Sequence, residues 1–330
     1  MKSILENIAA HLSVPSPSHV LVQLWGTSAQ AEDLKQFVKI LEPIHTSVKG
    51  ILFDSEAMVL TCENGPYEIG HHISEDEITQ TQVVIDLCCY SPTGLIQEMS
   101  DRAKPNFIAF MRRHFALISA PGKQFLQVRL PSRINAAESG MSLEDYTDVF
   151  NRLSSATQTE LEAFCTQRRV ELEKTIAVSI QTSEEHTLSL SYANRPWYSD
   201  HGDGDFPAGE VYIAPIENSA EGTFKADLVF WEGEHFKDVV LTFEAGVLTS
   251  SSVPQILEDL SHAGPGALSI AEFGLGVNPK LDFMTGHSLF DEKIMGSCHI
   301  AVGMNHLFGG QTECGVHVDF VSKHPKLIFS

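Results

Sequence analysis

The chain has 330 residues, of which 43% are apolar and 20% charged, as in a globular protein long enough for two domains. Its formal net charge of -21 at pH 7 repels phosphate backbones, so nucleic acid is excluded as an expected partner, whereas metal ions and peptide amines are attracted. The longest apolar runs fall far short of the roughly 18–20 residues that cross a membrane. The N-terminus has the pattern of an amphipathic helix and not of a signal peptide, so we expect a cytoplasmic protein without a membrane partner.

The first part of the chain alternates between strand-like and helix-like patterns. Apolar runs predict strands at residues 19–25, 48–53, 58–62, 82–89 and 125–130. Helical spacing of apolar side chains predicts helices at residues 28–41, 92–102 and 107–115. This alternation predicts a three-layer α/β domain over residues 1–140. No Gly-rich loop follows a predicted strand, so a nucleotide site is not expected there.

The second part of the chain has a different pattern of predicted secondary structure. A capping-box-like start at Ser142 predicts a helical stretch that continues, with a break near residues 154–155, to about Glu173. Short strands with turn residues between them are then predicted at residues 177–182, 187–192, 210–214, 223–229, 239–244 and 247–248. We therefore expect a β-rich α+β domain over residues 141–330.

Acidic and imidazole side chains recur in four Gly-flanked, strand-like segments of this second domain, at residues 206–215, 270–279, 289–303 and 316–321. They are Glu210, Glu272, Glu292, His299, His317 and Asp319. His317 and Asp319 are two residues apart, so on a strand they project from the same face. One imidazole and one carboxylate pointing the same way form half of a metal site.

Glu272 and His299 each interrupt an apolar stretch shortly before a glycine. A carboxylate buried without a partner costs several kcal/mol, and a cation compensates that cost directly. Carboxylates and imidazoles without thiolates suit Zn, Mn, Co or Fe(II). Three or more carboxylates balance the charge of two divalent ions about 3.5–4 Å apart, so the sequence predicts a site for divalent metal ions.

The four segments, taken in this order, resemble the aminopeptidase T / aminopeptidase S / PepS family of metallopeptidases. Arg195 with Pro196 and Trp197, and the helix start at residues 140–146, fit the same pattern. The resemblance covers roughly residues 125–321. It implies an α/β N-terminal domain, two divalent ions as cofactor, peptides as substrates, removal of their N-terminal residues, and a homodimer.

The resemblance also implies a role for each matching position. Glu210, His299, His317 and Asp319 would be metal ligands, and Glu272 would be shared between the two ions. Glu292 would be a further ligand or would handle the proton of the attacking water, and Arg195 would bind substrate. Many family members have a tyrosine where this chain has His306, and three alternatives stay open for the histidine: it binds metal, it donates a proton, or it marks a subgroup with different chemistry.

Two other interpretations stay open at the level of the sequence. The 2,5-dihydroxypyridine dioxygenase group resembles the chain more distantly, through its His-x-Asp segment and a stretch like residues 220–223. It implies a single Fe(II) held by two histidines and one carboxylate, with histidine at the position of Glu272. The other interpretation is an inactive scaffold that retains a metal. Two bound metal ions per chain favour the peptidase, and one iron favours the dioxygenase.

Overall fold

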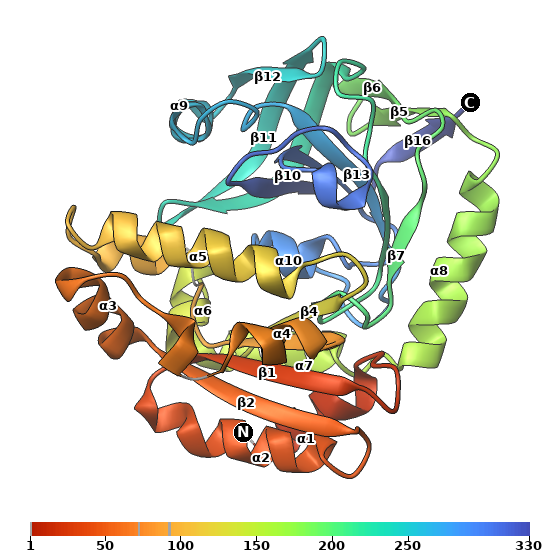
Figure 1. Cartoon of the computed structure of the whole chain (residues 1–330). Helices are drawn as coiled ribbons and strands as arrows, with labels where there is room; N and C mark the ends of the chain where they lie inside the picture. Colours follow the sequence, from red (N-terminus) through yellow and green to blue (C-terminus); the bar gives the residue numbers. More distant parts are fainter. Residues whose placement is uncertain (1, 72, 92–93) are drawn as a thin grey trace. The chain divides into compact units, whose positions relative to one another are not determined.

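The structure is a computed structural model that describes residues 2–71, 73–91 and 94–330 and divides into two compact units (Figure 1). Unit 1 comprises Met1–Ala137, Ser142–Thr147 and Gly202–Pro207. Unit 2 comprises Glu138–Met141, Asp148–His201 and Ala208–Ser330. The chain therefore passes between the units several times around residue 140, where the sequence predicts a single boundary.

Unit 1 is built on a parallel sheet with the strand order β2-β1-β3-β4-β8. Its strands are β1 (His19–Gly26), β2 (Ser47–Asp54), β3 (Val83–Cys88), β4 (Gln124–Arg129) and β8 (Asp205–Phe206). All six residues of β3 are buried, as expected for a strand that helices cover on both faces. Figure 1 shows α1 and α2 on one face of this sheet and α3, α4 and α5 on the other.

The helices of unit 1 follow the strands along the chain. They are α1 (Lys2–His11), α2 (Ala31–Leu41), α3 (Ser55–Asn64), α4 (Glu75–Gln80), α5 (Lys104–Ile118) and α6 (Arg133–Glu138), with 3-10 turns at Ser28–Gln30, Ile69–His71 and Gly94–Glu98. Helix α7 (Leu143–Leu153) begins at the predicted cap, where Ser142 Oγ accepts from the Asp145 N–H at 3.1 Å.

Two predicted elements of unit 1 differ from the structure. Residues 58–62 were expected to form a strand but lie in α3, because the Asp54 side chain caps a helix by accepting from the Ala57 N–H at 2.9 Å. Only Met58 and Cys62 of α3 are buried, and their spacing of four residues is that of one helix face. In place of the helix expected over residues 92–102, the structure has the short turn Gly94–Glu98, and residues 92 and 93 lie outside its described part.

Unit 2 consists of two largely antiparallel sheets that share one apolar core. The first, in the order β12-β11-β10-β6-β5-β16, has β5 (Ala177–Gln181), β6 (Thr187–Ser191), β10 (Glu221–Trp231), β11 (Glu234–Glu244), β12 (Val247–Ser251) and β16 (Lys326–Phe329). The second, in the order β15-β14-β13-β9-β7, has β7 (Tyr198–Asp200), β9 (Glu210–Ile213), β13 (Ile270–Gly276), β14 (Cys298–Gly303) and β15 (His317–Ser322).

Buried side chains from both sheets, such as Phe224 and Leu241 from the first and Phe273 and Ile300 from the second, pack into this core. The remaining elements of unit 2 are α8 (Gln158–Leu172), α9 (Pro254–His262), α10 (Ser288–Asp291) and the turn His306–Phe308. The parallel α/β sheet of unit 1 and the β-rich unit 2 confirm the predicted fold class. None of the helices in the described ranges has both the length and the apolar character that crossing a bilayer requires.

Candidate metal centre

The five-stranded sheet of unit 2 brings together side chains that are far apart in the sequence. Glu272 on the central strand β13 lies opposite Ala301, and Ala301 lies opposite Asp319 on β15. Glu210 opens β9 on the other side of β13, opposite Gly276. Antiparallel pairing of β9, β13, β14 and β15 therefore carries the carboxylates and imidazoles to one place on the sheet.

The two histidines are fixed by different local features. His299 on β14 lies opposite Gly274, and a Cβ at Gly274 would come within 2.1 Å of the His299 Nε2. The imidazole thus lies where a side chain at Gly274 would be. His317 on β15 is oriented by its Nδ1, which lies 2.7 Å from the Met304 carbonyl oxygen and leaves Nε2 for the cluster. A second partner that fixes the ring orientation is typical of metal-binding histidines.

The distances define two overlapping groups of ligand atoms. His299 Nε2 lies 3.0 Å from Glu272 Oε1 and 3.3 Å from Glu210 Oε2. His317 Nε2 lies 3.5 Å from Glu272 Oε2 and 3.5 Å from Asp319 Oδ1. Within each of the groups Glu210–Glu272–His299 and Glu272–His317–Asp319, one potential ligand atom per residue lies within 4.8 Å of the others. Glu292, His299 and Asp319 form a third such group.

The cluster is buried and strongly acidic. Glu210, Glu272 and Glu292 are each 6% exposed, and His299 has no exposed surface. Burial raises the pKa of Glu272 and raises that of Glu292 well above its usual range. Neighbouring carboxylates that destabilise one another's charge favour any bound cation.

The surrounding carboxylates favour the protonated, cationic form of both histidines. Burial alone would lower the pKa of His299, but its hydrogen bond to Glu272 and the charges of Glu210, Glu272 and Glu292 outweigh burial and raise the pKa to about 9. Burial also opposes the charge on His317, but Asp319 and Glu272 outweigh it and raise its pKa well above 6.5. The same pairing lowers the pKa of Asp319 against the effect of burial. The cluster therefore binds positive charge, whether as protons or as a metal ion.

The side chains fit a divalent metal ion. Within the described residues, Glu210 Oε2 is buried and accepts no hydrogen bond, although it lies 3.3 Å from His299 Nε2. Carboxylate oxygens and imidazole nitrogens that converge without thiolates are the ligand set of Zn, Mn, Co and Fe.

A buried lysine belongs to this centre and was not predicted from the sequence. Lys293 has no exposed surface, and its Nζ lies 2.5 Å from Glu210 Oε1, 2.8 Å from Glu292 Oε1 and 3.9 Å from Asp200 Oδ2. A single ammonium group cannot balance three carboxylates. A lysine next to Glu292 in an otherwise apolar segment was the available signal, because a lysine is almost never fully buried without a partner.

Asp291 supports the loop that carries Glu292 and Lys293. Its carboxyl accepts from the Thr285 and Gly286 N–H groups, each at 2.8 Å, and burial raises its pKa to about 7. The loop also packs closely on the metal-site strand, because a Cβ at Gly276 would lie 2.1 Å from the Ile294 carbonyl oxygen. Glu292 and Lys293 are thereby held in place from a short helix, α10, and not from a strand.

Two sequence-predicted site residues lie apart from these contacts. Arg195 is engaged by Glu217, whose two carboxylate oxygens each lie 2.9 Å from its Nη2. Glu217 also accepts from the Gln311 N–H at 2.7 Å, which ties Arg195 to the loop after β14. His306 in the same loop is exposed, and its Nδ1 lies 3.4 Å from the Thr312 carbonyl oxygen. Across the described ranges, no hydrogen bond or ion pair joins either side chain to the cluster.

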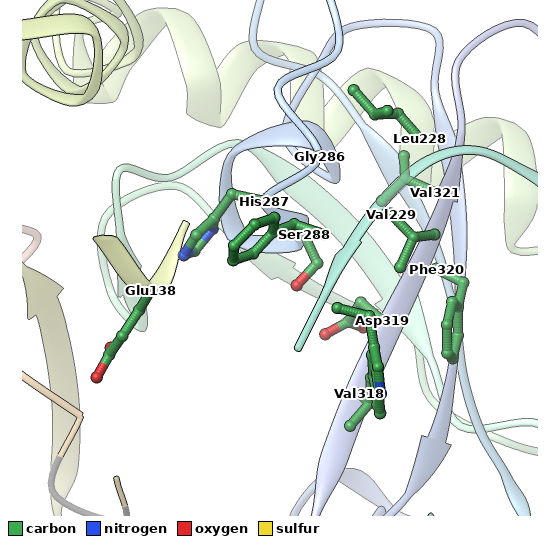
Figure 2. Close-up of a pocket in the computed structure, with 12 residues that line it drawn as sticks. Glu138, Leu228, Val229, Gly286, His287, Ser288, Val318, Asp319, Phe320 and Val321 are labelled. Atoms are coloured by element: carbon green, nitrogen blue, oxygen red, sulfur yellow. The ribbon is translucent and has the colours of Figure 1, made fainter. Parts of the chain in front are cut away.

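A cavity of about 170 Å³ in unit 2 adjoins the cluster at Asp319 (Figure 2). Residues Gly286–Ser288 line one side of it, and β15 lines another from Val318 onward. Phe230 and Trp231 of β10 contribute aromatic surface, and Glu138 contributes a carboxylate. A ligand in this cavity would lie next to Asp319, the one residue that the cavity lining shares with the cluster among the described residues.

The two-unit α/β and β-rich fold, with a buried carboxylate–imidazole cluster in its β-rich unit, defines a metal-binding protein. The family model for the thermophilic metalloprotease family (M29) matches residues 110–314. The match covers more than half of the chain, so the chain belongs to this family. It is therefore a metal-dependent peptidase, a hydrolase with a divalent metal cofactor.

Solved structures show the same fold. AmpT from Thermus thermophilus has a TM-score of 0.71 at 16% identity, with 99% of this chain and 93% of that chain covered. The 2,5-dihydroxypyridine dioxygenase from Pseudomonas putida KT2440 has a TM-score of 0.62 at 12% identity, with 99% of this chain and 92% of that chain covered. In the comparison with curated protein sequences, none matches the chain.

Proposed function

We propose that the protein is an aminopeptidase that uses two divalent metal ions to remove the N-terminal residues of peptides. The observation that carries this proposal is the position of Glu272, which belongs to both groups of potential ligands, Glu210–Glu272–His299 and Glu272–His317–Asp319. A carboxylate between two ligand groups suits two adjacent ions, because each oxygen serves one of them.

On this proposal the two ions would lie at the sheet formed by β9, β13, β14 and β15. Glu210 and His299 would hold one ion, His317 and Asp319 the other, and Glu272 both. When bound, such ions lower the pKa of a water molecule toward neutrality and polarise a peptide carbonyl. Zn, Co and Mn are the candidates, because the ligands are carboxylates and imidazoles.

Glu292 is the group that we propose handles the proton. Glu292 is buried, and burial raises its pKa well above the usual range. Potential ligand atoms of Glu292, His299 and Asp319 lie within 4.8 Å of one another. Lys293, 2.8 Å away, holds the carboxyl in place. A carboxylate of raised pKa is suited to accept the proton of the attacking water and to donate it to the leaving amine.

The substrate would approach through the cavity of Figure 2. Its free α-ammonium group would be attracted by the carboxylates of this region, Asp319 and Glu138, which line the cavity together. A blocked N-terminus lacks that charge, and cleavage is thereby restricted to the first residue. On the family resemblance, we further propose that Arg195 contacts substrate and that His306 donates a proton.

The resemblance also supports two proposals on the protein's state, a homodimer and a cytoplasmic location. Sedimentation of the purified protein tests the first: a mass of twice 36.3 kDa is expected, and a monomer would contradict it. Fractionation of cells that express the untagged chain tests the second.

Metal content and peptide release together test the proposed function. Protein loaded with Zn, Co or Mn should contain two ions per chain and release free amino acids from unblocked tripeptides, but not from N-acetylated ones. Glu272→Gln should lower the metal content and abolish release, whereas Glu313→Gln, on an exposed loop of the same unit, should change neither. Absence of release with all three metals would contradict the proposal.

The mononuclear Fe(II) dioxygenase remains an outcome of the same metal analysis. Its site requires two histidines and one carboxylate around one ion. Each ligand group found in the described part of the chain contains one histidine and two carboxylates. One iron per chain, with ring cleavage of a dihydroxypyridine, would favour the dioxygenase over the peptidase.

A further inference from the structure

A row of polar side chains crosses the middle of the parallel sheet in unit 1. In the strand register, Gln23 of β1 lies opposite Asp86 of β3, and Asp86 lies opposite Gln127 of β4. Gln23 is fully buried and Asp86 is 4% exposed. Buried strands of a parallel sheet are normally apolar throughout, and a polar group in them is costly unless it is partnered.

Helix α5 adds His114 to this row. The His114 Nε2 lies 2.5 Å from Gln23 Oε1, and Gln23 Nε2 donates to Asp86 Oδ1 at 2.5 Å. Burial lowers the pKa of His114 to about 4, so the ring is neutral and its Nε2–H donates to Gln23. Its Nδ1 is buried and has no hydrogen-bond partner within the described ranges. The network therefore retains an unused acceptor on a side chain that is only 2% exposed.

These groups line a cavity of about 160 Å³, which we call the unit 1 cavity. Its polar lining includes Asp86, Ser91, His114, Gln127 and Arg129, and its apolar lining includes Trp25, Phe115 and Phe125. The volume is below the roughly 300–1,000 Å³ of pockets for drug-sized molecules, so a smaller ligand is implied.

The cavity holds one acidic and one basic side chain, Asp86 and Arg129, that are not paired with each other. Arg129 is close enough for its charge to act on the Asp86 carboxyl. Among the described residues, none of the ion pairs within 4.0 Å includes Arg129. Burial raises the pKa of Asp86 to about 7, which a bound cation would reverse. A ligand with one positive and one negative group would therefore satisfy both side chains.

The position of the cavity in the sheet is one where ligands are expected. Strand β1 lies between β2 and β3, with α2 following β1 on one face and α5 following β3 on the other (Figure 1). The strand order thus reverses between β1 and β3. Open α/β sheets bind ligands at such a switch point, near the carboxyl ends of the strands. Trp25 and Arg129 line the cavity at those ends of β1 and β4, and Asp86 and Gln127 extend its lining to the middle of β3 and β4.

We propose that the unit 1 cavity binds a free α-amino acid with an apolar side chain. Its ammonium group would meet the Asp86 carboxylate, its carboxylate would meet the Arg129 guanidinium, and its side chain would lie among Trp25, Phe115 and Phe125. An α-amino acid carries its two charges on adjacent carbons, so both fit one small cavity. This site lies in unit 1 and uses none of the side chains of the metal centre, so it does not depend on the proposed peptidase activity.

Calorimetric titration of the full chain after metal removal by a chelator tests the proposal. L-leucine, L-methionine and L-phenylalanine are the probes, and chelation removes any binding of the amino acid to metal ions in unit 2. We expect saturable binding of at least one of them. 4-Methylvaleric acid, which lacks the amine, and isoamylamine, which lacks the carboxylate, should bind at least about tenfold more weakly than leucine, because each leaves one charged side chain unpaired.

Variants locate the binding. Asp86→Asn and Arg129→Gln should each weaken leucine binding about tenfold or more, since each removes one charge of the pair. Asp76→Asn and Arg112→Gln, on exposed positions of unit 1, are the matched controls and should bind as the wild type does. Hydrogen exchange should slow over β3 and α5 when leucine is added.

Two results of these binding experiments would overturn the proposal. No binding of any of the three amino acids at concentrations up to about 10 mM would overturn the proposal. Binding that is lost on chelation, or that Asp86→Asn and Arg129→Gln leave unchanged, would assign the amino acid to another site and would also overturn it. The analogue series needs only the wild-type chain, so the result stands even if a variant fails to fold.

Discussion

Gly274 and His299 face each other across strands β13 and β14, and a Cβ on Gly274 would lie 2.1 Å from the His299 Nε2. The imidazole at the centre of the metal cluster therefore depends on the absence of a side chain on the neighbouring strand. This relationship couples the fold of the sheet to the position of a proposed metal ligand, because both residues lie on fully buried strands.

Gly274→Ala should displace His299 from the cluster. The buried strand cannot move away at low cost, so we expect a loss of about 1–3 kcal/mol in the free energy of unfolding and a lower metal content. Chemical denaturation and elemental analysis measure the two effects. Gly315→Ala is the control, since a Cβ there meets no atom within 4 Å. Full metal content in Gly274→Ala would show that the ring does not need this space.

Lys293→Met should destabilise the metal-free protein far more than a comparable change at an exposed lysine. The substitution leaves Glu210 and Glu292 buried without their nearest cation, a loss of about 3–5 kcal/mol. Lys280→Met removes the partly exposed ion pair with Glu160 and should cost about 0–1 kcal/mol. Equal effects of the two substitutions on the free energy of unfolding would contradict the role assigned to Lys293.

Asp86→Asn should change how stability depends on pH. Burial raises the pKa of Asp86 from 3.8 to about 7, so between these values the folded state keeps a proton that the unfolded state has lost. Each rise in pH across that window therefore lowers the free energy of unfolding of the wild type through this group. The asparagine of the variant does not titrate. The free energy of unfolding of the variant minus that of the wild type should therefore rise by roughly a few kcal/mol from about pH 4 to pH 7.

The wild type serves as the control, because it shares every other titrating group with Asp86→Asn. His114 acts in the opposite direction, because burial lowers its pKa to about 4 and acidification destabilises the folded state. Both proteins contain His114, so its contribution largely cancels in the difference between wild type and Asp86→Asn. A difference that stays constant between about pH 4 and pH 8 would mean that Asp86 is ionised in the folded protein.

His306→Ala separates catalysis from metal binding. Its ring is exposed, and within the described ranges its contact is with the Thr312 carbonyl, so metal content and unfolding temperature should match the wild type. If His306 takes the place of the tyrosine of many family members and donates a proton, kcat should fall while KM changes less. Steady-state kinetics on an unblocked tripeptide measure both. An unchanged kcat would remove His306 from the proposed catalytic residues.

The sequence by itself determined the class of fold and the identity of the six clustered side chains. Periodicity revealed the buried strands of both units, because a strand covered on both faces must be apolar, and a charged residue inside such a strand is conspicuous. Glu272 and His299 were predicted on that ground. The strand predicted at residues 58–62 was wrong, because a local cap at Asp54 starts a helix that apolar composition alone does not distinguish from a strand.

Only the tertiary structure decided which of these side chains meet. Strand register places Glu272 between His299 and His317, and register depends on pairings between residues that are distant in the chain. The burial of Lys293 among three carboxylates, and the row Gln23–Asp86–Gln127 across unit 1, arise in the same way. A local segment can show that a polar side chain is unusual there, but its partners come from strands and helices that are distant in the sequence.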